Sequence, residues 1–467
     1  MPDWKKIIDL YKENLLTDLD GLLRIPSVKD PKTASVEAPF GKAIQKALDY
    51  MLKLGQRDGF KGKDIDHYAA HLEIGQGKKL LGILSHLDVV PADESQWDNP
   101  PFIPIIKDGK LFARGALDDK GPTLLAYYAV KILQDCGYRW NHRLRLIYGT
   151  DEENNWEGIN YYFQKEEMPD YGIVPDGIFP MIYAEKGVAS IKLSTNYSSK
   201  DLLYFASGYA YNVVPDYAKA VLNSSTSLET DFQNFLSKEE LRGTFKQDNN
   251  QICLEVFGQS AHAAGPDKGL NAGLHLIHFL TQLKLDEGAT DFIRFIDKHL
   301  YNDFKGEQLK LAFDDTELGS TTLNTALIHF ENGNATVGIN FRYPASYPFK
   351  NRYQHLMELL ADHNFSSSLI SHQLPSQSNV NDPEAKILLE AYHKHTDDQT
   401  VPLAIGGLTY ARVFKRGVTF GPAFLGKPAT LHQPNEYIEL EDLFKGLEIY
   451  LDALYQLATV EGQRDSL

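Results

Sequence analysis

The chain has little of several things that would place it in a narrow class. Its 467 residues include only two cysteines, Cys136 and Cys253, which lie far apart and outside any ligand-like pair. Reduced thiols are therefore expected rather than a disulfide or a thiolate metal site. No apolar stretch approaches the ~20 residues that a membrane-spanning helix needs, so no membrane partner is expected.

Positive charge is also in short supply. Lys and Arg number 47 against 63 Asp and Glu, which gives a formal net charge of −16. Because phosphate binding relies on basic patches, no nucleic-acid partner is expected. The N-terminal segment, residues 1–7, has charges throughout an amphipathic helical pattern and does not resemble a secretory signal, so a cytoplasmic location is the expectation.

What the chain does have is a set of acids and imidazoles next to strand-like apolar runs. Four such runs in its first part lead into His86, Asp118, the pair Glu152 and Glu153, and Asp176. In open α/β sheets the ligand site lies beyond the carboxyl ends of the strands, so these residues are expected to converge. Any one of them alone is more often a hydrogen-bonding residue than a ligand, but the coincidence of four predicts a metal site. His432, far downstream, supplies one more imidazole.

The ligand types indicate which metals the site would take. Two imidazoles with three or more carboxylates and no thiol suit zinc, manganese or cobalt better than calcium or magnesium. There are more carboxylates than one tetrahedral zinc needs, which favours two ions with a bridging carboxylate. Glu152 and Glu153 are adjacent, so one can bind metal while the other faces the substrate as a general base. The pair could also be a solvated first helical turn, and we expect both descriptions to hold.

Four segments that carry these residues resemble one known family in sequence order: 85–91, 115–122, 149–153 and 175–177. The chain is similar to the M20 family of di-metal peptidases, and within it to the PepV-type dipeptidases of lactic acid bacteria. The resemblance implies a hydrolase for dipeptides with a free N-terminus, with Xaa-His or β-alanyl dipeptides within its range. Alternatives are an M20-type deacylase of N-acyl amino acids and a two-domain peptide-binding protein without catalysis.

The resemblance also implies a role for each residue of the site. Glu152 would be the general base, and Asp88 would hold the imidazole of His86, a pairing that fixes the tautomer. Asp119 stands at a position that varies in the family and is not counted as a ligand. Two divalent ions, zinc or else manganese or cobalt, with Asp118 between them, would be held by five residues: His86, Asp118, Glu153, Asp176 and His432.

Further residues are expected to contact the substrate, three from a lid and two glycines from the second part of the catalytic domain. His262, in the segment 258–264, resembles the family histidine that stabilises the oxyanion. Asn212 and Arg342 match residues that contact the bound dipeptide; a surface ion pair is the plainer explanation of Arg342, although its planar fork suits a terminal carboxylate. Gly406 and Gly407 could form an ordinary turn, or could bring backbone amides close to a substrate.

Residue patterns predict how the chain is divided. Strand and helix patterns alternate from about residue 68 to 183, as in a mostly parallel sheet with helices on both faces, and the texture changes after residue 187. We expect an α/β catalytic domain built from residues 1–185 and 375–467, with an inserted α+β lid at 186–374. This is the architecture of the di-zinc exopeptidases that the resemblance implies. The split catalytic domain follows from the need to bring His432 to the same site as His86.

The length of the insertion predicts a monomer. In compact dimeric relatives, as the resemblance implies, the lid histidine comes from the neighbouring subunit, and small lids pair through a sheet edge. Here the insertion has two halves, with Asn212 and His262 in the first and Arg342 in the second. A second half can cover the edge strand that otherwise invites a partner, so His262 is expected to act within its own chain.

Overall fold

The computed structural model describes residues 2–428 and 430–464. The chain forms two compact units. The first comprises Met1–Tyr183, Ser378–Leu403 and Leu408–Leu467, and the second comprises Ala184–Gln377 and Ala404–Gly407. The second unit includes the range expected for the lid and adds Gly406 and Gly407, which had been assigned to the catalytic domain. The reason is local: the amide of Lys186 donates to the carbonyl of Ile405 at 3.0 Å, which attaches this short segment to the second unit.

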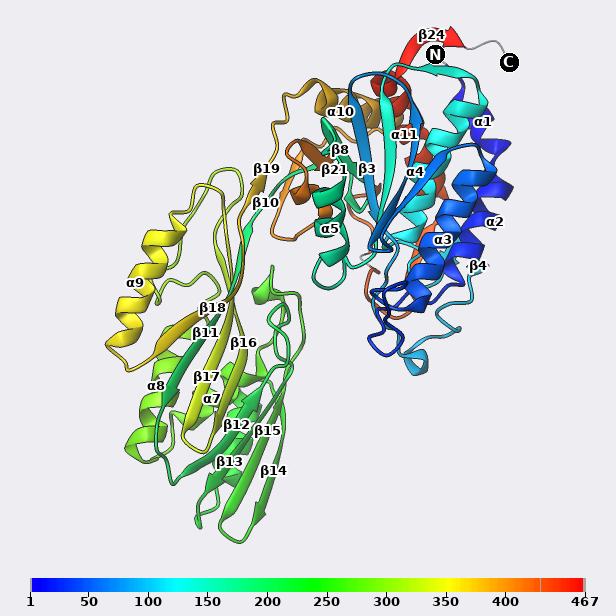
Figure 1. The fold of residues 1–467 in the computed structure, drawn as a ribbon. Coiled ribbons are helices and arrows are strands. Elements are labelled where there is room, and N and C mark those ends of the chain that lie inside the picture. The colour runs from blue at the N-terminus through cyan, green and yellow to red at the C-terminus, as the bar shows by residue number, and fades with distance from the viewer. Residues whose placement is uncertain (1, 429, 465–467) are drawn as a thin grey trace. The chain divides into compact units, whose positions relative to one another are not determined.

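A central sheet organises the first unit (Figure 1). Strand β3 pairs in parallel with β7 and β8, and β8 pairs in parallel with β21, whereas β1 and β2 are antiparallel. All residues of β3 are buried, as expected for a strand covered on both faces. In spatial order these six strands are β1 (Lys61–Ile65), β2 (Ala69–Gly75), β7 (Arg143–Gly149), β3 (Leu80–His86), β8 (Tyr171–Val174) and β21 (Gly417–Thr419). Beyond β21 the sheet continues with β10 (Ile182–Glu185), in which Ile182 pairs with Thr419.

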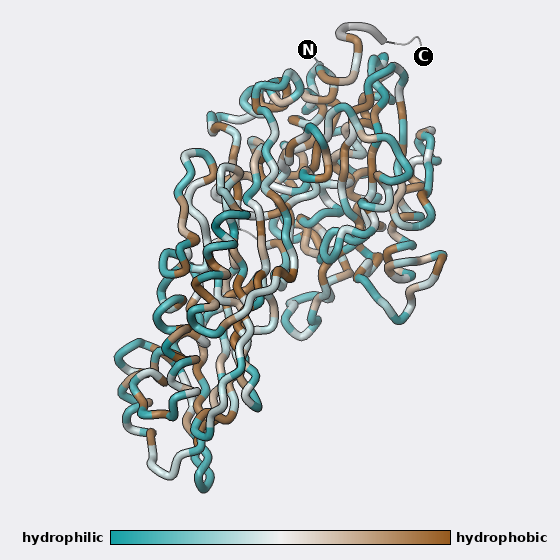
Figure 2. Tube along the Cα trace, turned by 60° about the vertical axis from the view of Figure 1, so that its left-hand side comes forward, coloured by the Kyte–Doolittle hydropathy of each residue, from teal (hydrophilic) through white to brown (hydrophobic). Residues whose placement is uncertain are grey.

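Helices pack on both faces of this sheet. One face buries the larger hydrophobic cluster, formed with α1 (Trp4–Asp9), α2 (Lys12–Leu23), α3 (Lys42–Arg57), α4 (Lys120–Asp135), α10 (Pro383–His395) and α11 (Leu440–Ala458). The other face packs against α5 (Glu157–Lys165) and the short 3-10 helix η3 (Tyr410–Val413) in a smaller cluster. Hydrophobic colour gathers in the interior of this unit, and most of its outer loops are hydrophilic (Figure 2). The predicted α/β class is confirmed.

Smaller elements complete the first unit. A three-stranded sheet has the order β23 (Tyr437–Glu439), β5 (Lys110–Phe112) and β4 (Ile105–Lys107). Two further pairs are β22 (Pro422–Ala423) with β9 (Gly177–Ile178), and β24 (Thr459–Arg464) with β6 (Tyr138–Trp140). Three short strands lie where the chain passes from one unit to the other: β10 (Ile182–Glu185), β19 (Ser376–Gln377) and β20 (Leu403–Ile405). The 3-10 helix η1 (Glu94–Gln96) lies in a loop of the first unit. No helix in the described part of the chain has both the length and the apolar character needed to cross a bilayer.

The second unit is an antiparallel sheet with helices packed against it, which is an α+β arrangement. Its strands, in spatial order, are β14 (Arg242–Asp248), β15 (Gln251–Phe257), β13 (Tyr217–Asn223), β12 (Leu202–Ser207), β16 (Thr322–Glu331), β17 (Asn334–Tyr343), β11 (Gly187–Asn196) and β18 (Ser366–Gln373). Its helices are α6 (Glu229–Lys238), α7 (Ala272–Leu280), α8 (Glu287–Leu300), α9 (Phe349–Ala361) and the 3-10 helix η2 (Pro266–Lys268). The pairing of β12 with β16 joins the two halves of the sheet into one.

Two local expectations were wrong. The strand expected to run to residue 117 ends at Phe112, because amide groups beyond it donate to a side chain instead of a neighbouring strand. The pair Glu152 and Glu153 does not open a helix, since α5 begins only at Glu157. The carboxylate of Asp151 accepts the amide of Glu157 at 3.1 Å and holds the intervening residues in a turn.

Candidate metal centre

Four of the predicted residues leave the central sheet at the same edge. His86 ends β3, Glu152 and Glu153 follow β7, and Asp176 follows β8; these strands are parallel neighbours. Their carboxyl ends therefore meet, as the sequence pattern predicted. Asp118 arrives by another route, on the loop between β5 and α4, so the expectation that a strand of the sheet ends there was wrong.

Two imidazoles lie on either side of one carboxylate. Nε2 of His86 is 3.0 Å from Oδ1 of Asp118, and Nε2 of His432 is 3.0 Å from Oδ2 of the same residue. His86 also lies 3.6 Å from Oδ2 of Asp176, and His432 lies 3.1 Å from Oε1 of Glu153. Ligand atoms of His86, Asp118 and Glu153 all fall within 4.8 Å of one another, a grouping that could hold a metal ion. The five residues predicted as ligands thus form one cluster within the first unit.

The cluster carries more negative charge than its imidazoles neutralise. Burial together with the charge of Asp118 raises the pKa of Glu153 to about 7, and burial raises the pKa of Glu152 well above its usual value. Burial and Asp118 likewise raise the pKa of Asp176. Although burial opposes its charged form, the carboxylates of Asp118 and Glu153 raise the pKa of His432 to about 10. Each of these raised pKa values means that the cluster binds positive charge, here a proton, more readily than an isolated side chain does.

Asp88 makes different contacts from those expected. Its carbonyl oxygen, not its carboxylate, lies within hydrogen-bonding distance of Nδ1 of His86, at 2.9 Å. The carboxylate is 3.6 Å from that nitrogen and instead accepts the amides of Glu152 and Glu153, each at 3.1 Å. A carbonyl can only accept, so Nδ1 of His86 is the donor and Nε2 is left facing Asp118. Asp88 therefore holds the turn that carries the two glutamates as well as the imidazole.

Further buried polar residues support the site and were given no role from the sequence. Oδ2 of Asp119 accepts the backbone amide of His86 at 2.9 Å, and Lys120 donates to the carbonyls of Leu22 at 3.2 Å and Ile25 at 2.6 Å. Each of these side chains is fully buried. The run of two aspartates and a lysine before a helix reads equally well as a solvated helix start, so composition alone does not distinguish these residues.

A second pair of supporting residues anchors the glutamate turn. Nζ of Lys29 lies 2.7 Å from Oδ1 of Asp151, whose side chain is fully buried. Lys29 comes from the segment after α2, far away in the sequence. A long-range pair of this kind leaves no local signal, so sequence patterns could not have identified it.

The residues expected to contact the substrate belong to the second unit, where several are neighbours. The amide of Ala263 donates to the carbonyl of Asn212 at 2.9 Å, which places the segments of Asn212 and His262 side by side. Arg342 is buried, its Nε donates to Oδ1 of Asn340 at 3.1 Å, and its Nη1 donates to the carbonyl of Gly406. Burial lowers the pKa of Arg342 to about 10. The plainer explanation of Arg342, a surface ion pair, is therefore wrong.

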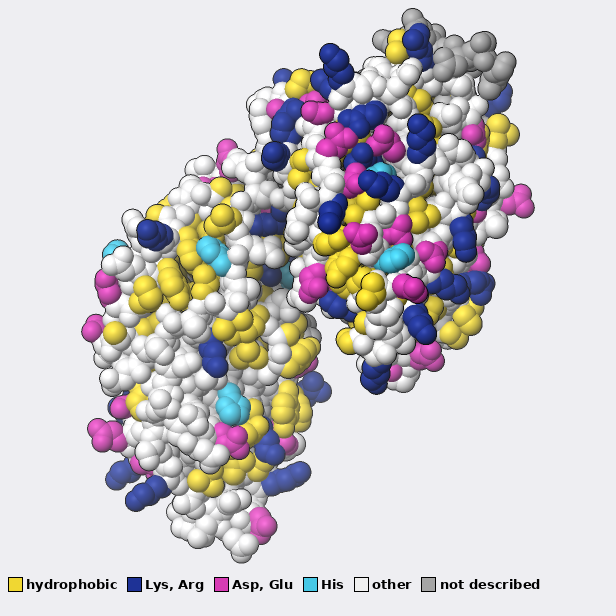
Figure 3. Space-filling model, in the orientation of Figure 1, with side chains coloured by type: hydrophobic (Ala, Val, Ile, Leu, Met, Phe, Trp, Pro, Cys, Tyr) yellow, Lys and Arg dark blue, Asp and Glu magenta, His cyan; other side chains and the backbone are white. Residues whose placement is uncertain are grey.

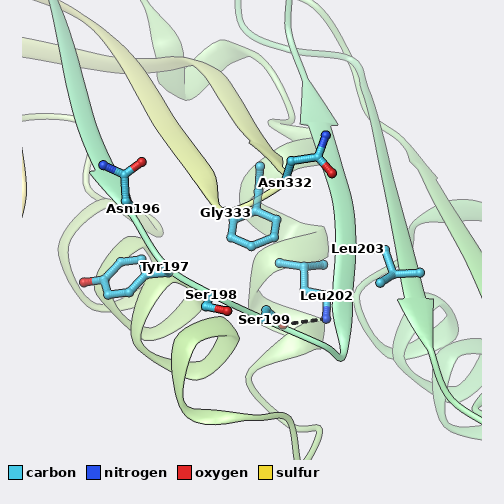
Figure 4. Close-up of a pocket in the computed structure, with 9 residues that line it drawn as sticks. Asn196, Tyr197, Ser198, Ser199, Leu202, Leu203, Asn332 and Gly333 are labelled. Carbon is cyan, nitrogen blue, oxygen red and sulfur yellow. Dashed lines mark hydrogen bonds between the residues drawn. The ribbon is translucent and has the colours of Figure 1, made fainter.

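A hollow of about 550 Å³ lies elsewhere in the second unit (Figure 4). It is formed between the chain segments that join β11 to β12 and β16 to β17, and within it Oγ of Ser199 accepts the amide of Leu202 at 2.9 Å. The side chains around it include amides, hydroxyls and apolar groups but no carboxylate, imidazole, lysine or arginine: Asn196, Tyr197, Ser198, Ser199, Leu202, Leu203, Phe330, Asn332 and Gly333. It offers no group for acid–base or metal chemistry.

Comparison with known proteins gives a consistent result. Residues 82–456 match the sequence profile of peptidase family M20/M25/M40. Relatives in Staphylococcus aureus strains USA300 and MW2, which carry the provisional name of dipeptidases, are each 41% identical over 469 residues. Each alignment covers 98% of this chain and 100% of the relative.

Solved structures share the fold at much lower sequence identity. Human carnosine dipeptidase 1 matches with a TM-score of 0.60 and 17% identity, over 98% of this chain and 99% of the other. The di-peptidase Dug1p of Saccharomyces cerevisiae matches with a TM-score of 0.59 and 14% identity, over 97% and 98%. The aminopeptidase PepT of Bacillus cereus matches with a TM-score of 0.57 and 14% identity, over 96% and 98%.

Proposed function

Since the chain belongs to peptidase family M20/M25/M40, we propose that it is a metal-dependent dipeptidase that cleaves dipeptides with a free N-terminus. Its relatives that are 41% identical and carry the provisional name of dipeptidases support this choice within the family. The observation that carries the proposal is the position of Asp118, one carboxylate oxygen of which is 3.0 Å from His86 and the other 3.0 Å from His432.

The donor set fits divalent metal. Carboxylates and imidazoles without a thiol are ligands that zinc, manganese and cobalt all accept. Burial, together with the charge of Asp118, raises the pKa values of Glu153 and Asp176, and a bound cation would stabilise the charged form of both carboxylates. We propose two ions, zinc in the first place and otherwise manganese or cobalt. His86 and Asp176 would hold one, Glu153 and His432 the other, and Asp118 would be shared.

The chemistry divides between the ions and the side chains of the chain. Divalent ions, when bound, supply a Lewis acid and lower the pKa of a coordinated water toward ~7. Glu152 would act as the general base, because it lies beside the ligands on a turn that Asp88 fixes through the amides of Glu152 and Glu153. Glu152 would accept a proton from the attacking water and later pass that proton to the leaving amine. The carbonyl of Asp88 keeps the imidazole of His86 in one orientation throughout.

Residues of the second unit would recognise the substrate. His262 would stabilise the oxyanion, and Asn212 and Arg342 would contact the dipeptide. Arg342 suits a terminal carboxylate because its guanidinium is buried and donates to two neutral groups, Oδ1 of Asn340 and the carbonyl of Gly406. Among the residues that the structure describes, no carboxylate forms an ion pair with it. Gly406 and Gly407 would offer backbone groups. A monomer in the cytoplasm, with His262 acting on its own chain, belongs to the same proposal.

The runner-up substrates are N-acyl amino acids, which the same metal cluster could hydrolyse. A panel of Xaa-dipeptides, Xaa-His and β-alanyl dipeptides, tripeptides and N-acetyl amino acids separates these functions by their kcat/KM values. The proposal predicts that dipeptides with a free N-terminus are cleaved fastest. A preference for blocked N-termini would overturn the dipeptidase assignment. Binding of dipeptides without release of amino acids would instead indicate a peptide-binding protein.

A further inference from the structure

Glu436 is a fully buried acid on the same loop as His432, four residues further along the chain. Both oxygens of its carboxylate accept hydrogen bonds. Oε1 accepts the amides of Leu117 at 2.8 Å and Asp118 at 3.1 Å. Oε2 accepts Nη1 of Arg114 at 2.7 Å and the amide of Gly115 at 3.1 Å. Four hydrogen bonds from one segment therefore converge on one carboxylate.

The segment that Glu436 holds is the loop 113–118, which ends at Asp118. Besides the carboxylate contacts, the carbonyl of Glu436 accepts the amide of Ala113 at 3.1 Å. Immediately afterwards, β23 pairs with β5, with Tyr437 opposite Phe112. The two chain segments that carry His432 and Asp118 are thus joined by Glu436 and by the strand that follows it.

Arg114 supplies the counter-charge in this arrangement. The ion pair of Arg114 and Glu436 is buried, with side-chain exposures of 3% and 0%. The guanidinium also lies over the ring of Trp97, 5.2 Å from its centroid. A buried pair is costly to form unless its remaining hydrogen-bonding capacity is used. The backbone amides of Gly115, Leu117 and Asp118 use that of Glu436, whereas Nε of Arg114 has no hydrogen-bond partner among the described residues. An apolar pair could fill the same space at no such cost, so the polar arrangement points to a need for fixed geometry.

We propose that Glu436 is a positioning residue that fixes the 113–118 loop. Asp118 is thereby held between the imidazoles of His86 and His432, where two metal ions could share its carboxylate. The inference rests on the proposed function, because it concerns the same metal centre. Glu436 touches neither imidazole in the contacts described and acts through the backbone of Asp118. Partners of metal ligands that act in this way typically contribute 10- to 100-fold to metal affinity.

The substitution Glu436→Gln tests the proposal with little change in volume. Glutamine replaces one oxygen with an NH₂ group, and in either orientation that group would face donors rather than acceptors. The loop must then move. The matched control is Glu439→Gln on β23, whose carboxylate contacts Lys427 at the surface and not the loop. The measurement is the dissociation constant for Mn²⁺, obtained by titration calorimetry on metal-free protein, together with the thermal midpoint of the metal-free form.

The expected result is a rise of 10- to 100-fold in the Mn²⁺ dissociation constant for Glu436→Gln and no change for Glu439→Gln. Activity of Glu436→Gln should also recover as the Mn²⁺ concentration increases, which a purely structural defect would not allow. A dissociation constant within twofold of the wild-type value would overturn the proposal, as would loss of activity without loss of Mn²⁺ affinity.

A second variant decides the matter if Glu436→Gln does not fold. Arg114→Lys retains a cation beside Glu436 but loses the guanidinium geometry, and should weaken Mn²⁺ binding in the same direction by a smaller factor. Wild-type affinity in Arg114→Lys would then overturn the proposal. The wild-type titration separates this inference from the proposed function: an unmodified protein that binds no Mn²⁺ contradicts both, whereas normal wild-type binding with an insensitive variant contradicts only the role of Glu436.

Discussion

Replacing Asp88 with asparagine separates two possible tasks of this residue. The family resemblance implied that its side chain holds the imidazole of His86, whereas in the structure the carboxylate accepts the amides of Glu152 and Glu153. The imidazole is held by the Asp88 carbonyl, which the substitution leaves in place. Asp88→Asn should therefore disturb the glutamates and leave the tautomer of His86 unchanged.

The expected size of the effect follows from the contacts. Asp88 is fully buried, so water cannot replace a lost acceptor. The amide group of asparagine can accept from one of the two backbone N–H groups only, and its NH₂ would face the other. Loss of one hydrogen bond to a charged group corresponds to ~1.5–3 kcal/mol. At 1.4 kcal/mol for each factor of ten, kcat/KM should fall by about 10- to 100-fold.

The assay combines kinetics with spectroscopy. Hydrolysis of a dipeptide is followed at saturating Mn²⁺, and histidine-selective nitrogen NMR reports which ring nitrogen of His86 carries the proton, with the signal assigned by its loss in His86→Asn. We expect slower hydrolysis and an unchanged Nδ1–H signal. A changed tautomer in Asp88→Asn would refute the assignment of the carbonyl as the partner of the imidazole. Full activity would refute the role of the carboxylate in holding the turn.

Three further predictions concern the base, a structural ion cluster and assembly. Glu152→Gln should lose 10²- to 10⁴-fold in kcat while Mn²⁺ binding is retained, and an active variant would remove Glu152 as the base. Although burial opposes the charged form of His395, Asp452 and Glu448 raise the pKa of its imidazole. The protonated imidazole therefore stabilises the folded protein at pH values below 6.5, its pKa in the unfolded chain, and this stabilisation is lost as the pH rises through the higher pKa of the folded state. His395→Gln should thus lower the thermal midpoint more at pH 6 than at pH 9, and an equal or opposite difference would contradict this. If His262 acts within its own chain, a mixture of His262→Ala and Glu152→Gln should be no more active than its components, and recovered activity would indicate shared sites.

Much of the fold could be predicted because its signals are local. The buried apolar run of β3 and the helix α4, with Pro122 in its first turn, show in the sequence as continuous hydrophobicity and helical spacing. The convergence of His86 and Asp176 needed only the general rule that ligands bind at the carboxyl ends of parallel strands.

What sequence patterns missed depends on contacts between distant segments. Glu436 is 318 residues from Asp118, and nothing in its own neighbourhood distinguishes it from a solvated loop acid. The same holds for Lys29, which is 122 residues from Asp151. The turn at Glu152 and Glu153 was mistaken for a helix start because acids favour both positions, and only the hydrogen bonds of Asp151 and Asp88 decide between them.

The acidic side chains of the first unit are not segregated from the basic ones on the face shown in Figure 3. On the face shown in Figure 3, acidic and basic side chains of the first unit are interspersed. The excess of acids in the composition does not gather there into one field of a single sign.

Metal removal and restoration test the central claim most directly. The protein is stripped with a chelator, and release of free amino acids from a dipeptide is measured before and after addition of Zn²⁺ or Mn²⁺, with bound metal counted at each stage. The account predicts no release from the stripped protein and recovery when the cluster around Asp118 is reloaded. Undiminished cleavage by protein shown to be free of metal would contradict it.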